Sequence, residues 1–159
     1  PAITPIPPAR IHWADLKHYV EEFEWQHLGR LQADSDFYHK WMDEMKSKWR
    51  SVDDYIRSSV FNEKAVEIDG KFQAPEAASG EQEIIWKAND FPYAVEKDIH
   101  HDLIWYRQGM SDEEIEALIE KEKPTKEYDT CWFTNPPALR SVLTVQHSHV
   151  FWIRREHIQ

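Results

Sequence analysis

Apolar residues recur at intervals of three and four over the first third of the chain, a spacing typical of amphipathic helices. One helix is predicted over residues 11–31, with a buried stripe formed by Trp13, Leu16, Val20, Phe23, His27 and Leu31. A second is predicted to begin near Ser35, and its buried stripe would comprise Phe37, Trp41 and Met45. A third is expected to begin at Ser51, because Ser51 and Asp54 resemble an N-cap followed by an acidic first turn.

The pattern then changes to the alternation typical of β-strands. Asp69-Gly70, between two short alternating runs, predicts a hairpin over residues 65–72, and residues 74–82 are predicted to be a loop. Further strands are predicted over residues 83–88, 101–107, 130–134 and 141–154. Ser111 and Glu114 predict a capping box that begins a helix over residues 111–121. We therefore expect a single α+β domain over residues 11–159, with N-terminal helices packed on an antiparallel sheet, after a flexible proline-rich lead over residues 1–10.

Composition narrows the class of protein. The chain has 159 residues, of which 41% are apolar and eight are tryptophan, as expected for one folded domain. Cys131 is the only cysteine, which excludes an intrachain disulfide and a cysteine-based zinc site. No apolar run approaches the ~20 residues that span a bilayer, so we expect a soluble, cytoplasmic protein. The net charge of −10 opposes non-specific binding of nucleic acid, although a local basic patch could form from Lys46, Lys48, Arg50, Arg57, Arg154 and Arg155.

The last predicted strand carries two histidines on one face. Alternate residues of a strand share a face, so His147 and His149 point the same way among apolar neighbours. Such a pair can bind a metal ion or a phosphate, or combine a nucleophile with an acid–base group. Alternatively, both are half-buried core histidines with satisfied hydrogen bonds. Of His100 and His101, which open an earlier strand, alternation allows only one to join this face.

Other polar residues lie where turns or caps are predicted. Residues 89–93, which include Asn89, Asp90 and Tyr93, and also Asn135, either shape loops or bind a ligand. The acids of the predicted helix over residues 111–121 are favoured by the helix dipole even without a function; they are Asp112, Glu113 and Glu116. The sequence has no HExxH spacing, glycine-rich phosphate loop or GxSxG elbow, and we assign neither a metal nor a cofactor.

Several of these residues fall into ordered blocks that resemble a fungal family over about residues 38–154. The blocks are Tyr38, Trp41 and Lys46; Ser51 with Tyr55-Ile56; Asn89 to Tyr93; Ile99, His101 and Trp105; and Trp132-Phe133, Asn135, Leu139, Ser141-Val142, His147, His149-Val150 and Arg154. The chain resembles the family named after the N-acetylglucosamine-induced protein 1, long known only as a domain of unknown function. It departs from the family pattern at Trp49-Arg50, Phe91 and Ala94.

The resemblance implies an activity. Some members of that family are arginine-containing cyclodipeptide synthases, which take arginine and a second amino acid from aminoacyl-tRNAs, so Arg-tRNA is the implied partner. Those enzymes carry an Asp-Asp-x-x-Glu motif, for which Asp112-Glu113-x-x-Glu116 is a near match that would bind the arginyl guanidinium. In the same function, His147 or His149 would move protons in a site shared with His101, and Ser141 would accept the acyl group. The remaining substrate-binding residues would be Asn89, Asp90, Tyr93, Asn135 and Arg154.

Two alternatives stay open. The order of strands, loop and final His-x-His also resembles the histidine-triad nucleotide-binding fold, in which His149 would be the nucleophile and Phe151 stands at the third histidine position. Its cleft would hold an adenosine. The other alternative is a non-enzymatic binding protein, with or without a metal. We predict that His101, His147 and His149 converge on one cleft beside Asn135 and the loop over residues 89–93.

Overall fold

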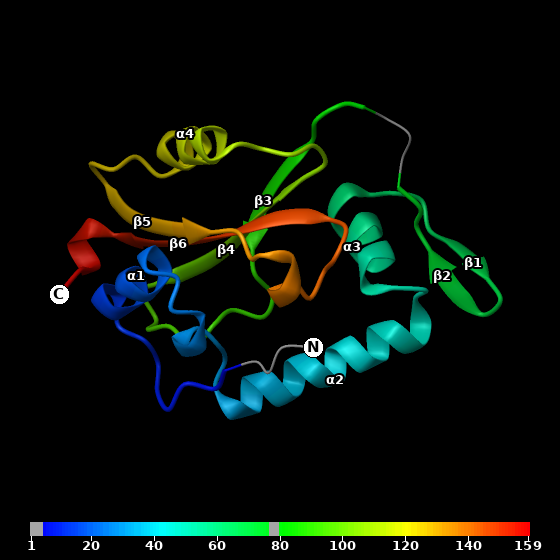
Figure 1. The fold of residues 1–159 in the computed structure, drawn as a ribbon, viewed down its shortest axis with the longest axis horizontal. Helices are drawn as coiled ribbons and strands as arrows, with labels where there is room; N and C mark the ends of the chain where they lie inside the picture. The colour runs from blue at the N-terminus through cyan, green and yellow to red at the C-terminus, as the bar shows by residue number, and fades with distance from the viewer. Residues whose placement is uncertain (1–4, 77–79) are drawn as a thin grey trace.

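The computed structural model describes residues 5–76 and 80–159 of the chain (Figure 1). The longer helices are α1 (Trp13–Glu21), α2 (Gln32–Lys48), α3 (Val52–Phe61) and α4 (Asp112–Glu122). The strands are β1 (Val66–Ile68), β2 (Lys71–Gln73), β3 (Ile84–Ala88), β4 (His100–Tyr106), β5 (Tyr128–Phe133) and β6 (Gln146–Arg154). Short 3-10 turns are η1 (Trp25–His27), η2 (Pro137–Leu139) and η3 (Arg155–His157). The predicted α+β class, with N-terminal helices packed on an antiparallel sheet, is confirmed.

The main sheet has four strands in the order β3-β4-β6-β5, and every neighbouring pair is antiparallel. In the register of the central pair, Trp105 lies opposite His147, and His101 lies opposite Phe151. Directly opposed residues of a sheet point to the same face. The odd-numbered residues of β4 and β6 therefore share one face, which brings all three predicted histidines to the same side.

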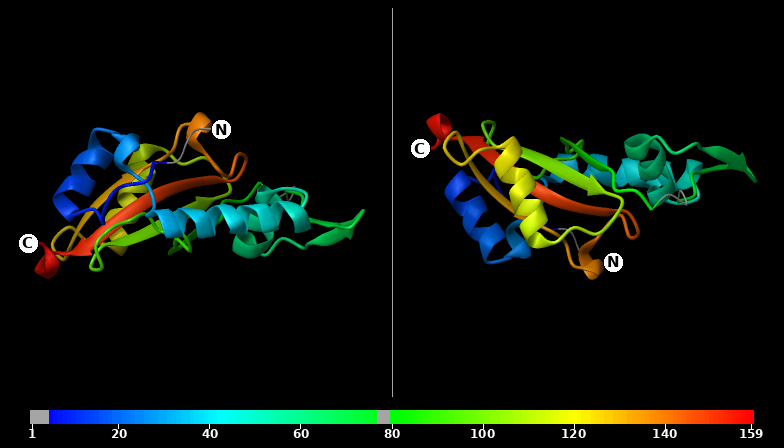
Figure 2. Two further views of the ribbon diagram at one scale, coloured as in Figure 1. Left: turned by 90° about the horizontal axis from the view of Figure 1, so that it is seen from below. Right: turned by 90° about the horizontal axis from the view of Figure 1, so that it is seen from above.

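The two faces of this sheet are covered differently (Figure 2). On one face, α4 packs Ile115 and Ile119 against Ile104 and Val150. On the other face, one hydrophobic cluster joins α1 to the end of β6 and includes Phe151 and Ile153. A separate cluster joins α3 to Trp105 near the start of β6. The histidines of β6 lie between these two clusters.

The predicted helix over residues 11–31 ends early. α1 stops at Glu21, and Phe23 takes a positive φ of 48°, which breaks helical geometry. After the short η1 turn the burial pattern is no longer helical: His27, predicted on a buried stripe, is exposed, while Leu28, Gly29 and Arg30 are buried. At Gly29 an added Cβ would lie 2.0 Å from the carbonyl oxygen of Pro5, so only glycine allows this close approach.

The second predicted helix also differs in detail. It begins at Gln32 rather than near Ser35, and its Phe37 is 64% exposed instead of buried. α2 packs against the rest of the protein through Trp41, whose ring centroid lies 4.8 Å from that of Phe91, and through Met42 and Met45, which contact the α3 cluster. No helix in residues 5–76 or 80–159 is long and apolar enough to cross a membrane.

Turn and cap signals were accurate. Asp69 and Gly70 both have positive φ, at 51° and 81°, and form the tip of the β1–β2 hairpin, which projects from the body beyond α3 (Figure 1). The Ser51 and Ser111 hydroxyls each accept a backbone N–H at 3.1 Å at the starts of α3 and α4. Part of the predicted loop over residues 74–82 lies outside the described residues.

The last strand is shorter than predicted. β6 begins at Gln146, and residues 141–145, predicted to extend it, form a bent connection. The cause is a long-range contact: the buried carboxylate of Asp53 accepts the backbone N–H groups of Leu143 and Thr144 at 3.3 and 2.6 Å. Those N–H groups are consequently directed to α3 instead of a neighbouring strand.

The neighbouring acid, Asp54, anchors the start of α3. Its fully buried carboxylate accepts hydrogen bonds from Arg50 at 2.7 and 3.0 Å and from the backbone N–H of Ala74 at 2.9 Å. Burial alone would raise the pKa of Asp54, but the bonds from Arg50, Ser51 and Ala74 outweigh it and lower that pKa to about 2. Asp53 and Asp54 are therefore structural anchors.

Candidate functional site

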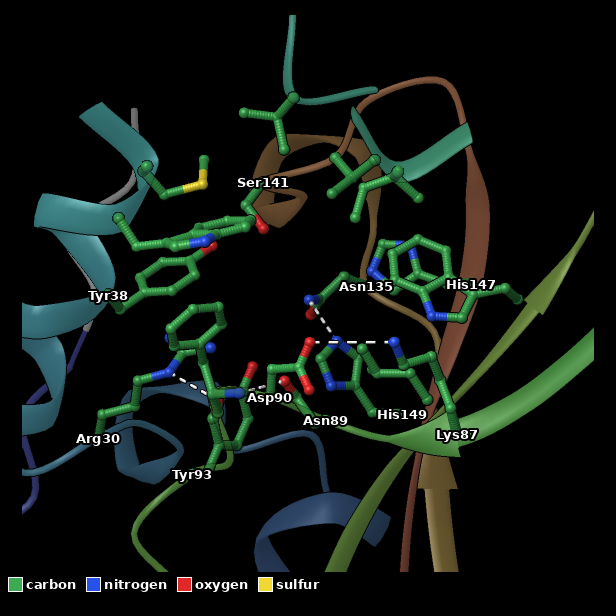
Figure 3. A pocket seen from close by; sticks show the side chains of 18 of the residues that line it. Arg30, Tyr38, Lys87, Asn89, Asp90, Tyr93, Asn135, Ser141, His147 and His149 are labelled. Atoms are coloured by element: carbon green, nitrogen blue, oxygen red, sulfur yellow. Dashed lines mark hydrogen bonds and ion pairs between the residues drawn. The ribbon is translucent and has the colours of Figure 1, made fainter. Parts of the chain in front are cut away.

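A cavity of about 200 Å³ opens on the sheet face that the two separate clusters cover (Figure 3). Its walls come from α2, α3, the β3–β4 connection, the segment before β6, and β6 itself. Most of the lining is aromatic or aliphatic, including Tyr38, Trp41, Tyr55, Phe91 and Trp105. The polar groups are fewer and comprise Arg30, Lys87, Asn89, Asp90, Tyr93, Asn135, Ser141, His147 and His149 among others. An apolar pocket with a few polar groups is the usual form of a small-molecule site.

A series of hydrogen bonds connects the loop over residues 89–93 to His101 and then to His149. The backbone N–H of Tyr93 donates to Nδ1 of His101 at 3.0 Å. Nε2 of His101 lies 2.9 Å from Nδ1 of His149. A backbone N–H can only donate, so Nδ1 of His101 is the acceptor and its Nε2 carries the proton. Nδ1 of His149 then accepts, which leaves the proton of neutral His149 on Nε2.

His147 has the opposite tautomer. Its Nδ1 lies 3.2 Å from the carbonyl oxygen of Val145, which can only accept, so Nδ1 carries the proton. Nε2 of His147 therefore has a free lone pair, and no described residue hydrogen-bonds it. His147 and His149 lie on the same face with ring centroids 5.6 Å apart, as predicted. One offers a proton acceptor and the other a hydrogen-bond donor.

Burial keeps all three histidines uncharged. His101, His147 and His149 are each less than a tenth exposed. Burial lowers the pKa of His147, and it lowers the pKa values of His101 and His149 well below the usual histidine value. The nearby Arg30 guanidinium lowers the pKa values of His101 and His149 further. Neutral imidazoles are the forms that the hydrogen-bond chain requires.

The two predicted asparagines, Asn89 and Asn135, lie beside these hydrogen-bonded histidines. Asn89 shapes its loop, because its Oδ1 accepts the backbone N–H of Phe91 at 2.8 Å, and its amide nitrogen lies 3.5 Å from Nε2 of His101. The amide nitrogen of Asn135 lies 3.4 Å from Nε2 of His149. The amide N–H of Asn135 and the Nε2–H of His149 are two donors that suit one ligand oxygen between them. With its amide turned over, Asn135 would instead present Oδ1 as an acceptor to the Nε2–H of His149.

The remaining predicted cavity residues have distinct environments. The phenol of Tyr93 stacks on His149 with ring centroids 5.6 Å apart, and burial raises the pKa of Tyr93. Asp90 is exposed at the cavity wall and lies 3.9 Å from the Lys87 amine. The hydroxyl of Ser141 reaches the cavity from the bent connection before β6 but hydrogen-bonds no described residue (Figure 3).

Several predicted site residues lie elsewhere. Asp112, Glu113 and Glu116 are exposed on α4, which covers the opposite face of the sheet from the histidines. Arg154 is exposed at the far end of β6 and lies over Tyr128 rather than at the cavity. The basic residues that could have formed one patch are also divided: α2 carries Lys46 and Lys48 toward the hairpin, whereas Arg154 lies near the C-terminus at the other end of the molecule (Figure 1). The sequence could not show where these residues lie relative to the cavity, because the packing of α4 and β6 decides it.

Sequence reasoning missed Arg30. This arginine follows η1, far from the other site residues in the sequence, and no local motif surrounds it. It is 8% exposed, lines the cavity, and donates from Nε to the carbonyl oxygen of Phe91 at 2.8 Å. The usable signal was a lone arginine within an otherwise apolar periodic run.

Residues 5–76 and 80–159 contain no group of three histidine, cysteine or acidic side chains placed to hold a metal ion. Phe151, which the histidine-triad alternative places at the third histidine position, is fully buried and stacks on His101 with ring centroids 4.2 Å apart.

Comparisons with known proteins agree with the fold. A crystal structure described as HTC1 has a TM-score of 0.61, with 21% sequence identity over 89% of this chain and 84% of that chain. No curated protein matches the sequence. A family model covers residues 12–153, a range that includes the blocks on which the family resemblance rests except for Arg154. The chain therefore belongs to the family described as "Protein of unknown function (DUF3605)".

Proposed function

We propose that the protein is an aminoacyl-transfer enzyme of the arginine-containing cyclodipeptide synthase type, and that the histidine cavity is its active site. The observation that carries the proposal is the opposite tautomers of His147 and His149 on one face of β6. Aminoacyl transfer needs a base for the attacking amine and a donor for the carbonyl oxygen. The cavity offers both within one strand.

The proposed step uses these groups directly. The α-amino nitrogen of one aminoacyl ester attacks the carbonyl carbon of the other, with the oxygen of that carbonyl held by the Nε2–H of His149 and the amide of Asn135. A C–N bond forms and the C–O bond to the tRNA ribose breaks. Nε2 of His147 takes the proton from the amine and returns it to the departing ribose oxygen. The free amine of the resulting dipeptidyl ester then attacks its own ester carbonyl; a second C–N bond closes the ring, the remaining C–O bond breaks, and the second tRNA leaves with the proton on its ribose oxygen.

Arginine selection is assigned to the cavity wall instead of α4. The rings of Tyr38, Trp41 and Phe91 lie next to one another, with centroid separations of 4.8 to 6.4 Å. Aromatic faces attract a guanidinium through cation–π contacts. Asp90, the carboxylate on the lining, would pair with its charge.

Ser141 distinguishes two versions of the reaction. If its hydroxyl accepts the acyl group first, Ser141→Ala abolishes product. If the amine attacks the ester directly, the same variant keeps its turnover. Mass spectrometry of the intact protein after incubation with Arg-tRNA would detect the acyl-enzyme in the first case.

The decisive experiment is a search for the product. The purified chain is incubated with Arg-tRNA and a set of other aminoacyl-tRNAs, and small molecules are analysed by mass spectrometry. We expect an arginine-containing diketopiperazine that His147→Ala loses. The proposal fails if no such compound forms although a thermal melt shows that the protein is folded.

A second candidate function has one observation in its favour. The Nδ1–H of His147 donates to a backbone carbonyl, which leaves Nε2 free as a nucleophile toward a phosphate ester, as in the histidine-triad hypothesis. In that case His147, and not His149, would attack, because the Nε2 of His149 carries a proton. Release of a nucleoside monophosphate from an adenylated substrate, with no diketopiperazine, would favour this candidate.

A further inference from the structure

Arg30 is a buried cation held between two aromatic rings. Its guanidinium carbon lies 4.0 Å from the centroid of the Tyr38 ring and 5.2 Å from that of Tyr93 (Figure 3). Its Nε donates to the carbonyl oxygen of Phe91, which fixes the plane of the guanidinium. The two terminal nitrogens make no hydrogen bond to any described residue, and the side chain lines the cavity.

Two other arginines show what a charge-balanced arginine looks like in this fold. Arg107 also lies over an aromatic ring, 4.5 Å from the centroid of Phe61, but it pairs with the carboxylates of Glu63 and Glu83. Arg57, whose side chain is 12% exposed, pairs with Asp54 at 3.4 Å. Arg30 is as well buried, yet no carboxylate of the described chain comes within 4.0 Å of it.

An uncompensated buried cation is costly. A lysine or histidine in this position could release its proton, but a guanidinium stays charged in proteins. Desolvation therefore has to be offset by an anion or by strong acceptors. The cavity contributes Asp90, which is exposed and lies beside Lys87.

Besides the acceptor Nε2 of His147, the cavity lining holds hydrogen-bond donors. The Nε2–H of His149 lies beside the amide nitrogen of Asn135, which also hydrogen-bonds the Tyr93 phenol, and the buried Nε1–H of Trp105 has no acceptor among the described residues. Such donors complement an oxyanion. A planar guanidinium whose two terminal nitrogens are free can bind two oxygens of one group.

We propose that Arg30, whose guanidinium lies between the rings of Tyr38 and Tyr93, forms an oxyanion subsite of the cavity. Its free terminal nitrogens would receive a carboxylate or phosphate group of the ligand. This subsite does not depend on the proposed aminoacyl transfer. If that reaction is correct, the oxyanion is the terminal phosphodiester of the aminoacylated tRNA end. If it is not, the subsite still defines the class of ligand.

The test is binding at constant ionic strength. The chain is titrated separately with inorganic phosphate and with acetate, and binding is followed by tryptophan fluorescence, since Trp41 and Trp105 line the cavity, and by the melting temperature. We expect saturable binding of at least one probe, and the stronger probe identifies the group. Arg30→Lys keeps the charge but loses the fork, so its affinity should fall about tenfold, and Arg30→Gln should lose binding.

Arg107→Lys is the matched control, because it alters a partly buried arginine beside an aromatic ring but away from the cavity. It should bind the probes like the parent. The subsite is refuted if neither probe saturates, or if Arg30→Lys and Arg30→Gln bind as tightly as Arg107→Lys. Diketopiperazine formation by the parent is measured separately, so loss of the subsite and loss of the proposed reaction are distinguishable.

Discussion

The two faces of the four-stranded sheet satisfy their buried polar groups in different ways. On the α4 face, the Ser148 hydroxyl lies 3.0 Å from that of Tyr106 and 2.7 Å from that of Thr134. On the cavity face, the adjacent residues of the same strand, His147 and His149, direct nitrogens at an open space. One strand thus carries a hydrogen-bonded polar side chain on one side, and on the other side histidine nitrogens directed at the cavity.

The difference follows from how each face is covered. A single helix, α4, covers its face, so every buried polar group there must find a partner within the fold. Asp102 illustrates this, since one of its oxygens accepts from the indoles of Trp86 and Trp152, both at 2.7 Å. The other face has two separate covers with a cavity between them, and the groups left without partners there are candidates for ligand binding.

The largest expected effect is on turnover. His147→Ala removes the free Nε2, and loss of a general base lowers the rate by about 10²–10⁴-fold. Ser148→Ala, one residue along β6, should leave turnover unchanged while it lowers the melting temperature. Diketopiperazine yield and thermal melts of both variants test this. Equal turnover losses in the two variants would contradict the functional difference between the faces.

A second effect is the pH dependence of stability. The pKa values of His101, His147 and His149 are lowered in the folded state, so the unfolded chain binds protons first as the pH falls below about 6.5. The free energy of unfolding should therefore decrease on acidification, by at most about 1.4 kcal/mol per pH unit for each histidine. Denaturant unfolding from about pH 8 to about pH 5 measures the slope.

The variant His149→Phe sharpens that measurement, because it removes one titrating group from the cavity face and keeps an aromatic ring. Its slope against pH should be smaller than that of the parent. An unchanged slope would show that the proton uptake comes from other groups.

The third effect concerns the α4 face alone. Asp102→Ala leaves the indole N–H groups of Trp86 and Trp152 without their acceptor, at a cost of about 1–3 kcal/mol each where they stay buried. Unfolding in denaturant measures this loss. Turnover per folded molecule should be unchanged, and a fall in turnover would mean that the faces are coupled.

The smallest effect is expected for the exposed acids of α4. Glu116→Gln and Asp112→Asn should change stability by a few tenths of a kcal/mol, because exposed charges interact weakly with the helix dipole. Diketopiperazine yield should be unchanged, since these acids lie on the face opposite the cavity. A loss above about 30-fold in either variant would instead place them on the substrate guanidinium.

Short-range patterns predicted the local features of this protein. The period of two placed His147 and His149 on one face, Asp69-Gly70 predicted the hairpin, and Ser111 predicted the start of α4. Each of these depends on residues within a few positions of one another, where backbone geometry and side-chain spacing decide the outcome. The α+β class followed from the same local signals taken in order.

Tertiary contacts decided the rest. Arg30 meets Phe91, Asp53 ends the predicted extension of β6 by binding Thr144, and the tautomer of His149 depends on a backbone N–H at Tyr93 through His101. Most of these partners are tens of residues apart, and even Tyr93 and His101 belong to different elements, so no local pattern contains them. The sequence by itself determined which side chains share a face, whereas only the packed structure determined which of them are satisfied and which remain free for a ligand, because burial and hydrogen-bond partners are properties of the assembled fold.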